Sequence, residues 1–189
     1  MKKTLACSSL MAIFFFLLVG TTPALAEHRA EALYLSPSVG GYLFDDNQDY
    51  EEAIAYGLTL GFNYTKKWGT EFTLNYIRTE DEQNVIGDID VGIFRWDVLY
   101  HFFPESPVIP YLAVGMGGLH TDPGEGDRDL NFMAEWGGGL KYYFTDNVAL
   151  RADARHIYEV EDEANNFLFS GGLIMQFGGS NTDRPLDRK

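Results

Sequence analysis

Two histidines, His101 and His156, could act as general bases if a nucleophile lay beside them. His156 is followed two residues later by Tyr158, and no serine lies near it in the sequence. His101 is spaced to share a strand face with Asp97, but Ser170, a candidate nucleophile, lies far away along the chain. Neither histidine has an evident nucleophile, so we expect no catalytic residues and no enzyme.

A different chemistry is indicated by charged residues at alternate positions of otherwise apolar segments. Because successive side chains of a β-strand point to opposite faces, these charges fall on the face opposite the bulky apolar residues. Isolated buried charge is costly, and equal numbers of acids and bases predict mutual pairing. The predicted network contains four acids and four bases: Glu71, Arg95, Asp97, Glu135, Lys141, Arg151, Asp153 and Arg155.

The segment 132–157 shows this alternation most clearly, as two strands around the turn Thr145-Asp146-Asn147. Bulky apolar residues such as Trp136 and Leu140 hold one face, while charged residues and glycines such as Glu135 and Gly137 hold the other. A water-soluble sandwich would bury the apolar face. Here that face is long and carries aromatic residues near its ends, which is typical of a membrane barrel with lipid outside and a narrow polar interior.

The same alternation predicts eight strands of about ten residues, the length that a tilted membrane strand requires. They span 33–43, 54–64, 68–77, 91–102, 109–119, 132–144, 148–157 and 166–177. Tight turns at 65–67, 104–107 and 145–147 alternate with longer segments near 44–53, 79–90, 120–129 and 158–165. We therefore predict an all-β fold, an eight-stranded antiparallel up-and-down transmembrane β-barrel with short periplasmic turns and longer acidic extracellular loops.

The energy of charges in lipid decides which face points outward. Each charge turned to lipid would cost up to about 2 to 4 kcal/mol at mid-bilayer. Reversing the assignment would turn the whole network to lipid, at a cost on the order of 10 to 30 kcal/mol, which exceeds a typical domain stability. The charged face is therefore predicted to be the interior.

The first 26 residues are predicted to be an export signal and not part of the fold. Lys2 and Lys3 precede an apolar run over 10–19, and Ala24 and Ala26 suit a cleavage site. The alternative is a retained anchor, although the run is too short to span a bilayer as a helix. Cys7, the only cysteine, lies in this signal, so thiol catalysis, disulfides and cysteine metal sites are excluded from the mature chain. The barrel is assigned to 27–178 and a short polar periplasmic tail to 179–189, and no cofactor is expected.

The chain is acidic, with a formal charge of −14 that becomes −16 without Lys2 and Lys3. Most acids fall in the four longer segments, which suits a solvated, self-repelling fringe at the cell surface. The alternative is weak binding of divalent cations between loops or to lipopolysaccharide phosphates, since hard cations take carboxylate oxygens. No loop has EF-hand spacing, and the sign of the charge argues against nucleic-acid binding. The loop acids are Asp45, Asp46, Asp49, Glu51, Glu52, Glu80, Asp81, Glu82, Asp88, Asp90, Asp122, Glu125, Asp127, Asp129, Glu159, Glu161, Asp162 and Glu163.

Several stretches resemble the eight-stranded barrel domain of the outer-membrane protein A type, over residues 30–178. They are 34–42, 57–64, 110–115 and 147–151. The closing stretch, with Gly172, Met175 and Phe177, resembles the signal read by the barrel-assembly machinery, although Met175 stands where an aromatic is common. Many members continue into a periplasmic peptidoglycan-binding domain, but only a short polar stretch follows Phe177 here, so we do not expect that function.

The resemblance implies an outer-membrane protein of a Gram-negative bacterium, with both termini in the periplasm and with membrane lipids, lipopolysaccharide and the assembly machinery as partners. Our first functional hypothesis is a structural or interaction role with a lumen closed by paired charges. The second is a narrow passive channel for ions or small solutes. A lipid-modifying enzyme, like the deacylases and palmitoyltransferases built on small barrels, is a third. A soluble lipocalin-like carrier is a rival that would need its apolar residues inside.

Overall fold

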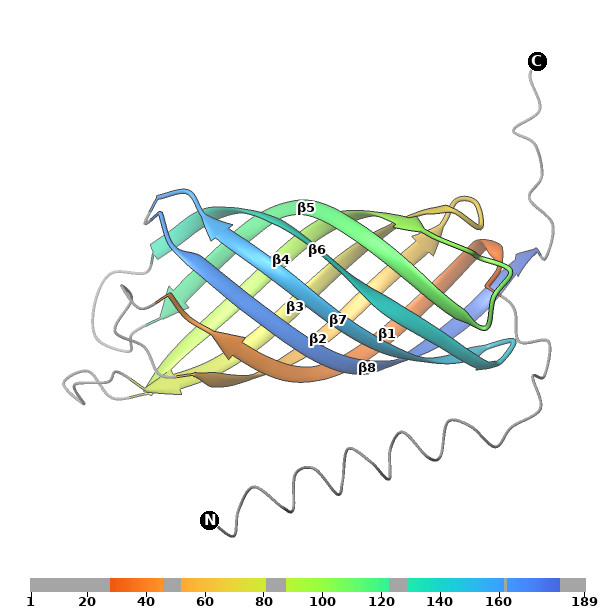
Figure 1. The fold of residues 1–189 in the computed structure, drawn as a ribbon. Helices are drawn as coiled ribbons and strands as arrows, with labels where there is room; N and C mark the ends of the chain where they lie inside the picture. The colour runs from red at the N-terminus through yellow and green to blue at the C-terminus, as the bar shows by residue number, and fades with distance from the viewer. Residues whose placement is uncertain (1–27, 46–51, 81–87, 123–128, 162, 181–189) are drawn as a thin grey trace, which may run out of the picture.

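Eight strands account for nearly all of the chain that the computed structural model describes, which is residues 28–45, 52–80, 88–122, 129–161 and 163–180. They are β1 (Ala30–Leu43), β2 (Ala53–Asn63), β3 (Trp68–Glu80), β4 (Asp88–His101), β5 (Val108–Asp122), β6 (Asp129–Thr145), β7 (Val148–Glu159) and β8 (Asn165–Ser180). Each strand pairs antiparallel with its neighbours in sequence, and β8 pairs with β1 to close a barrel (Figure 1). The predicted eight-stranded up-and-down barrel is confirmed.

The two ends of the barrel differ in their connections. The short connections 64–67, 102–107 and 146–147 lie at the end where β1 begins and β8 finishes, which we call the turn end. The strand ends that border 44–52, 81–87, 123–128 and 160–164 lie at the opposite end, which we call the loop end. The predicted signal peptide lies outside the described residues, as does the tail from residue 181, whereas β8 continues two residues past the predicted boundary at 178.

The predicted strand boundaries were wrong at the loop end, where several strands continue into segments assigned to loops. Glu80 pairs with Asp88, and Asp90 pairs with Asp122. Ladder hydrogen bonds join backbone groups and do not need apolar side chains, so the strands persist beyond the apolar belt. Part of the predicted acidic fringe is therefore strand.

Two of the three tight turns use the same side-chain device. The Thr65 hydroxyl accepts hydrogen bonds from the amides of Lys67 at 3.1 Å and Trp68 at 2.9 Å. The Thr145 hydroxyl does the same for Asn147 at 3.3 Å and Val148 at 3.0 Å. A threonine that satisfies the amides of the turn fixes its geometry without a partner from elsewhere in the barrel.

The alternation of side chains divides the wall into an apolar exterior and a buried interior. Leucines, valines and aromatic residues point outward, and Trp96 and Val114 are more than 60% exposed.

The closing β1–β8 ladder has no paired residues between Leu35↔Met175 and Ser38↔Gly172. Pro37 lies in this interval and has no amide hydrogen to donate. Within the described residues, no helix is long and apolar enough to cross a membrane.

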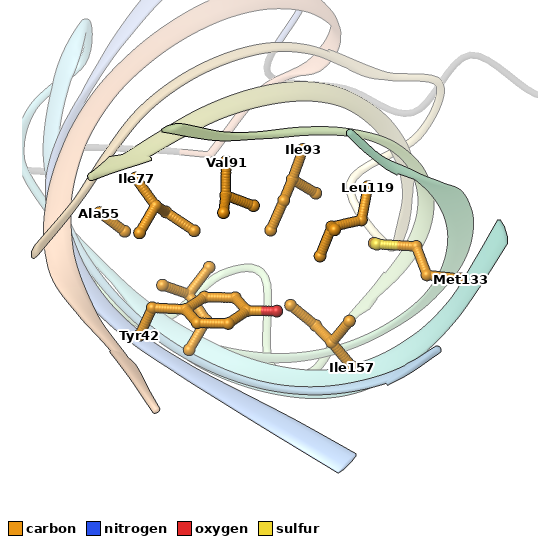
Figure 2. Close-up of a cluster of buried hydrophobic side chains, with 9 residues drawn as sticks. Tyr42, Ala55, Ile77, Val91, Ile93, Leu119, Met133 and Ile157 are labelled. Carbon is orange, nitrogen blue, oxygen red and sulfur yellow. The ribbon is translucent and has the colours of Figure 1, made fainter. Parts of the chain in front are cut away.

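The interior is layered along the barrel axis, and the eight predicted charges lie in its middle layer. Toward the turn end, Tyr34, Ile109, Tyr143, Ala149 and Ile174 pack together. The expectation of a polar interior was wrong toward the loop end, where a cluster of buried apolar side chains fills the barrel (Figure 2). This apolar cluster consists of Tyr42, Ala55, Ile77, Val91, Ile93, Leu119, Met133, Ile157 and Leu168.

Candidate functional site

All eight predicted charges lie inside the barrel, and none is more than 7% exposed. They come from β3, β4, β6 and β7. Within the ladders, Glu71 lies directly opposite Asp97, and Lys141 lies directly opposite Arg151. Like charges at directly opposite positions repel, so these residues need their counter-charges elsewhere. Several ion pairs accordingly join strands that are not neighbours in the sheet, whereas others lie within β7.

The central pair joins Arg151 on β7 to Glu71 on β3, across the interior. The two terminal guanidinium nitrogens of Arg151 donate to the two Glu71 oxygens at 2.7 Å and 2.8 Å. This parallel arrangement is the strongest geometry available to an arginine and a carboxylate. Arg151 also donates to Asp153 Oδ2 from Nε at 2.9 Å and from Nη2 at 2.6 Å. One arginine therefore neutralises acids from both sides of the barrel.

Arg155 is the second hub and lies closer to the loop end. Its Nη1 donates to Asp97 Oδ1 at 3.1 Å and to Glu135 Oε1 at 3.3 Å, and its Nε donates to Asp153. Arg95 Nη1 donates to Glu135 Oε2 at 3.1 Å. Arg95 Nε lies 3.7 Å from Asp97 Oδ2. Two arginines and two acids therefore form a closed ring of ion pairs, which shares Asp153 with the Arg151 hub.

Two tyrosines that the sequence prediction did not include complete the network. The Tyr34 hydroxyl donates to Glu71 and the Tyr111 hydroxyl donates to Asp153. Lys141 Nζ lies over both rings, at 4.6 Å and 5.1 Å from their centroids, and 3.7 Å from Glu71 Oε1. An aromatic face and a carboxylate together stabilise a buried ammonium group. The inward phase of both tyrosines was predictable, but their hydroxyl partners were not.

Glycines directly opposite the two tyrosines on the neighbouring strands make room for these large side chains. A Cβ atom at Gly61 would lie 2.1 Å from the Tyr34 ring, and one at Gly139 would lie 2.5 Å from the Tyr111 hydroxyl. Real Cβ contacts are essentially never this short, so a side chain at Gly61 would displace the Tyr34 ring, and one at Gly139 would meet both the Tyr111 hydroxyl and, at 2.2 Å, the Ala152 carbonyl oxygen. The glycines of the inner face therefore leave the space that the two tyrosine rings around Lys141 occupy.

One acid of the predicted loop fringe belongs to the interior. Glu159 is the last residue of β7 and is 1% exposed. Its carboxylate accepts a hydrogen bond from the Asn166 side chain of β8, which is also buried. Glu159 was assigned to the loops because its strand was expected to end at residue 157. Continued alternation from Asp153 and Arg155 was the signal that placed it inside.

The residues considered for catalysis do not form a nucleophile–base pair. His156 points outward and packs between Trp136 and Phe167, with ring centroids 4.3 Å and 4.8 Å away. His101 lies near the turn end with its Nε2 3.0 Å from Lys141 Nζ. Ser170 pairs in the ladder with Gly40 and Asp153, away from either histidine.

The remaining predicted sites divide between described and undescribed residues. Phe177 points outward near the turn end and is 54% exposed, and Met175 is a half-buried residue of the same face. Gly172 faces inward, where a Cβ would lie 2.5 Å from the Pro37 carbonyl oxygen. Eight of the eighteen predicted loop acids lie outside the described residues. Within the described part, no three histidine, cysteine or acidic side chains converge as a metal site would require.

The sequence profile of the outer membrane protein beta-barrel domain family matches residues 12–177. The chain belongs to this family. Two curated relatives, both called outer membrane porin F, align with this member of the family. The protein from Pseudomonas aeruginosa is 29% identical over 154 residues, which cover 74% of this chain and 43% of the relative. The protein from Pseudomonas fluorescens is 27% identical over 163 residues, which cover 82% and 43%. The chain thus spans less than half the length of these two relatives.

Solved structures share the fold of this outer membrane protein beta-barrel domain. The N-terminal β-barrel domain of Pseudomonas aeruginosa OprF superimposes with a TM-score of 0.58 at 23% identity, covering 79% of this chain and all of that chain. Neisserial surface protein A gives a TM-score of 0.61 at 16% identity, covering 80% of this chain and all of that chain. Ail of Yersinia pestis gives a TM-score of 0.56 at 15% identity, covering 79% of this chain and all of that chain. The chain is therefore an outer-membrane barrel of a Gram-negative bacterium.

Proposed function

We propose that this protein is a closed barrel with a structural or interaction role in the outer membrane, and that it carries little or no transport. The observation that supports this most directly is the filling of the interior in layers. The Arg151 and Arg155 hubs occupy the middle, and the apolar cluster lies between them and the loop end. Eight strands enclose a space that side chains can fill, and a dewetted apolar layer is a barrier to ions.

We further propose that the turn end faces the periplasm and the loop end faces the outside. Both β1 and β8 have their terminal ends at the turn end, which suits a chain that is exported and then inserted. The outward apolar belt would contact membrane lipids and lipopolysaccharide, and the acidic loops would carry any interaction with molecules outside the cell. Weak binding of divalent cations by those loops remains part of this proposal.

A narrow passive channel is the second candidate, because the two curated relatives carry the name porin. For this chain it would require the Arg155–Glu135 and Arg155–Asp97 contacts to separate and the apolar cluster to admit water. Exchange of ion-pair partners is inexpensive in a network where several acids surround each arginine. Displacing the nine packed side chains of the apolar cluster is costly, and this cost favours the closed state.

Conductance across a planar lipid bilayer tests the choice. Wild-type protein should show only small or rare events, because both barriers must open together. As a matched positive control, a variant with Arg155→Gly, Met133→Gly and Ile93→Gly removes side chains from both layers and should conduct more often. Steady, large, ion-selective conductance of wild type would replace the first proposal with the second.

We propose no catalytic role. The His156 imidazole lies between two aromatic rings, and His101 lies beside Lys141, so neither adjoins a hydroxyl positioned as a nucleophile. The outward aromatic Phe177, near the end of the last strand, is proposed as the terminal residue recognised by the barrel-assembly machinery. An insertion assay with Phe177→Ala tests that role.

A further inference from the structure

The two described residues that precede β1 enter the turn end of the barrel. His28 belongs to no strand, yet it is fully buried. Its ring centroid lies 4.5 Å from that of His101 on β4 and 5.7 Å from that of Tyr143 on β6. Its Nδ1 lies 3.1 Å from the Tyr143 hydroxyl, which in turn donates to Gln176 Oε1 of β8 at 3.1 Å. One imidazole outside the sheet therefore touches β4 and β6 directly and β8 through one hydroxyl.

The backbone at the start of β1 is shaped to bring His28 inside. Glu31 has a φ of 51°, a left-handed conformation that non-glycine residues rarely adopt. Opposite it on β8, Gly178 and Gly179 have φ values of 66° and 87°. A Cβ at Gly179 would lie 2.7 Å from the Ala30 carbonyl oxygen, so glycine is needed for this close approach. Both strands therefore depart from regular β geometry where the chain passes from the buried His28 into β1.

Arg29 fastens the same segment to two further elements. Its Nη2 donates to the Asp146 carbonyl in the β6–β7 turn at 2.9 Å, and its own carbonyl accepts from Asn63 Nδ2 of β2 at 3.3 Å. Directly inside this segment lies the cluster that contains Tyr143, Ala149 and Ile174. Residues 28–30 thus cover the interior at the turn end and are attached around its rim.

The surroundings of His28 are unfavourable to a positive charge. Lys141 Nζ of β6 lies 3.0 Å from the Nε2 of the adjoining His101, and the nearest acid to that ammonium group is Glu71 at 3.7 Å, deeper in the barrel. Lys66, in the β2–β3 turn, is paired with Glu105 at 2.9 Å. No carboxylate of the described residues contacts His28. Burial, and secondarily the charge of Lys141, lowers the pKa of His28 to about 3.

We propose that residues 28–30 form a latch that closes the turn end of the barrel and is released when His28 takes up a proton. A released imidazole has an ordinary pKa of about 6.5, so the released form binds protons more tightly than the seated form. The stability of the seated form relative to the released form is therefore greatest above a pH of about 6.5, and it decreases as the pH falls from there toward 3. Between pH 7.5 and pH 5 the ratio of seated to released latch falls by about 30-fold.

Thiol labelling from the turn end tests this. The mature chain is expected to contain no cysteine, so Ala149→Cys introduces a single small thiol beneath the latch. The thiol is labelled with 4,4′-dithiodipyridine in detergent-solubilised protein, and its labelling rate is divided by that of the exposed control Asp146→Cys at the same pH. This ratio should be about 30-fold higher at pH 5 than at pH 7.5. An unchanged ratio across this range would overturn the proposal.

His28→Phe is the variant that isolates the proton, because it keeps an aromatic ring against His101 but cannot be protonated. In this background the relative labelling of Ala149→Cys should stay slow at both pH values, whereas an increase as large as that of the His28 protein would overturn the role of His28. If Ala149→Cys does not fold, an NMR titration of the His28 imidazole in the wild-type protein decides. A pKa well below 6.5 supports the seated latch, and a pKa near 6.5 overturns it.

Discussion

Replacing Arg151 by alanine tests whether the interior charges are held by mutual pairing. Arg151 donates two hydrogen bonds to Glu71 and two to Asp153, at distances of 2.6 to 2.9 Å. Without it, Glu71 keeps the hydrogen bond from the Tyr34 hydroxyl and two more distant cations, Lys141 at 3.7 Å and Arg155 at 3.9 Å. Breaking a buried pair costs about 3 to 5 kcal/mol, and these remaining partners favour the lower value of about 3.

A loss of about 3 kcal/mol corresponds to a fall of about 6 to 12 °C in the unfolding temperature for a domain of this size. The assay is thermal unfolding in detergent, read from the heat-modifiable mobility of the folded barrel on a gel. Lys67→Ala, which removes an exposed positive charge at the turn end, should leave the temperature unchanged within about 1 °C.

The double variant Arg151→Met with Glu71→Leu separates pairing from simple loss of a side chain. It removes both members of the central pair and leaves no uncompensated carboxylate at Glu71, so it should be more stable than Arg151→Ala alone. The reasoning is refuted if Arg151→Ala unfolds at the same temperature as Lys67→Ala. It is also refuted if the losses of stability of Arg151→Met and Glu71→Leu, each measured alone, add up to the loss of the double variant. Additivity would mean that the two residues do not interact.

Three further outcomes are expected. On intact cells, a membrane-impermeant maleimide should label Asp81→Cys at the loop end but not Lys67→Cys at the turn end, and the reverse pattern would invert the proposed orientation. Phe177→Ala should reduce the amount of folded protein in the outer membrane, measured by membrane fractionation, and equal amounts would remove its role in assembly. Ile93→Ala, in the apolar cluster, should lower the free energy of unfolding by about 2 to 5 kcal/mol in urea titrations, whereas the lipid-facing control Val114→Ala should cost clearly less.

Period-two alternation was enough to predict the strands and the direction of each charged side chain. Residues such as Glu71 and Arg151 follow the rule because a charge facing lipid is much more costly than a buried ion pair. Their partnership could not be predicted, because the tilt of the strands decides which residues meet across the interior. In the ladders they lie opposite Asp97 and Lys141, which carry like charges.

The apolar cluster and the latch were missed for different physical reasons. Ile77 and Ile157 have the inward phase, but they stand at the strand ends, where the adjoining acidic residues were assigned to loops. His28 lies outside every strand, so no periodic pattern applies to it. Its burial depends on the left-handed backbone of Glu31, and a sequence carries no local signal for such a conformation at a glutamate.

Tyr34 and a side chain at position 61 exclude each other, because the tyrosine ring occupies the space of the missing Cβ. At Gly139 the Ala152 carbonyl oxygen would be closer than the Tyr111 hydroxyl, at 2.2 Å, so a smaller residue at position 111 would not make room there. During divergence of this barrel, a larger residue at position 61 becomes acceptable only after Tyr34 has been replaced by a smaller residue, and a tyrosine can be regained at position 34 only where the glycine has persisted. Positions 34 and 61 are expected to covary between homologues, and the order of the two changes in a lineage is fixed. Positions 34 and 61 therefore record the history of the interior more faithfully than the charges do, since an arginine here can change its acid partner without a second substitution.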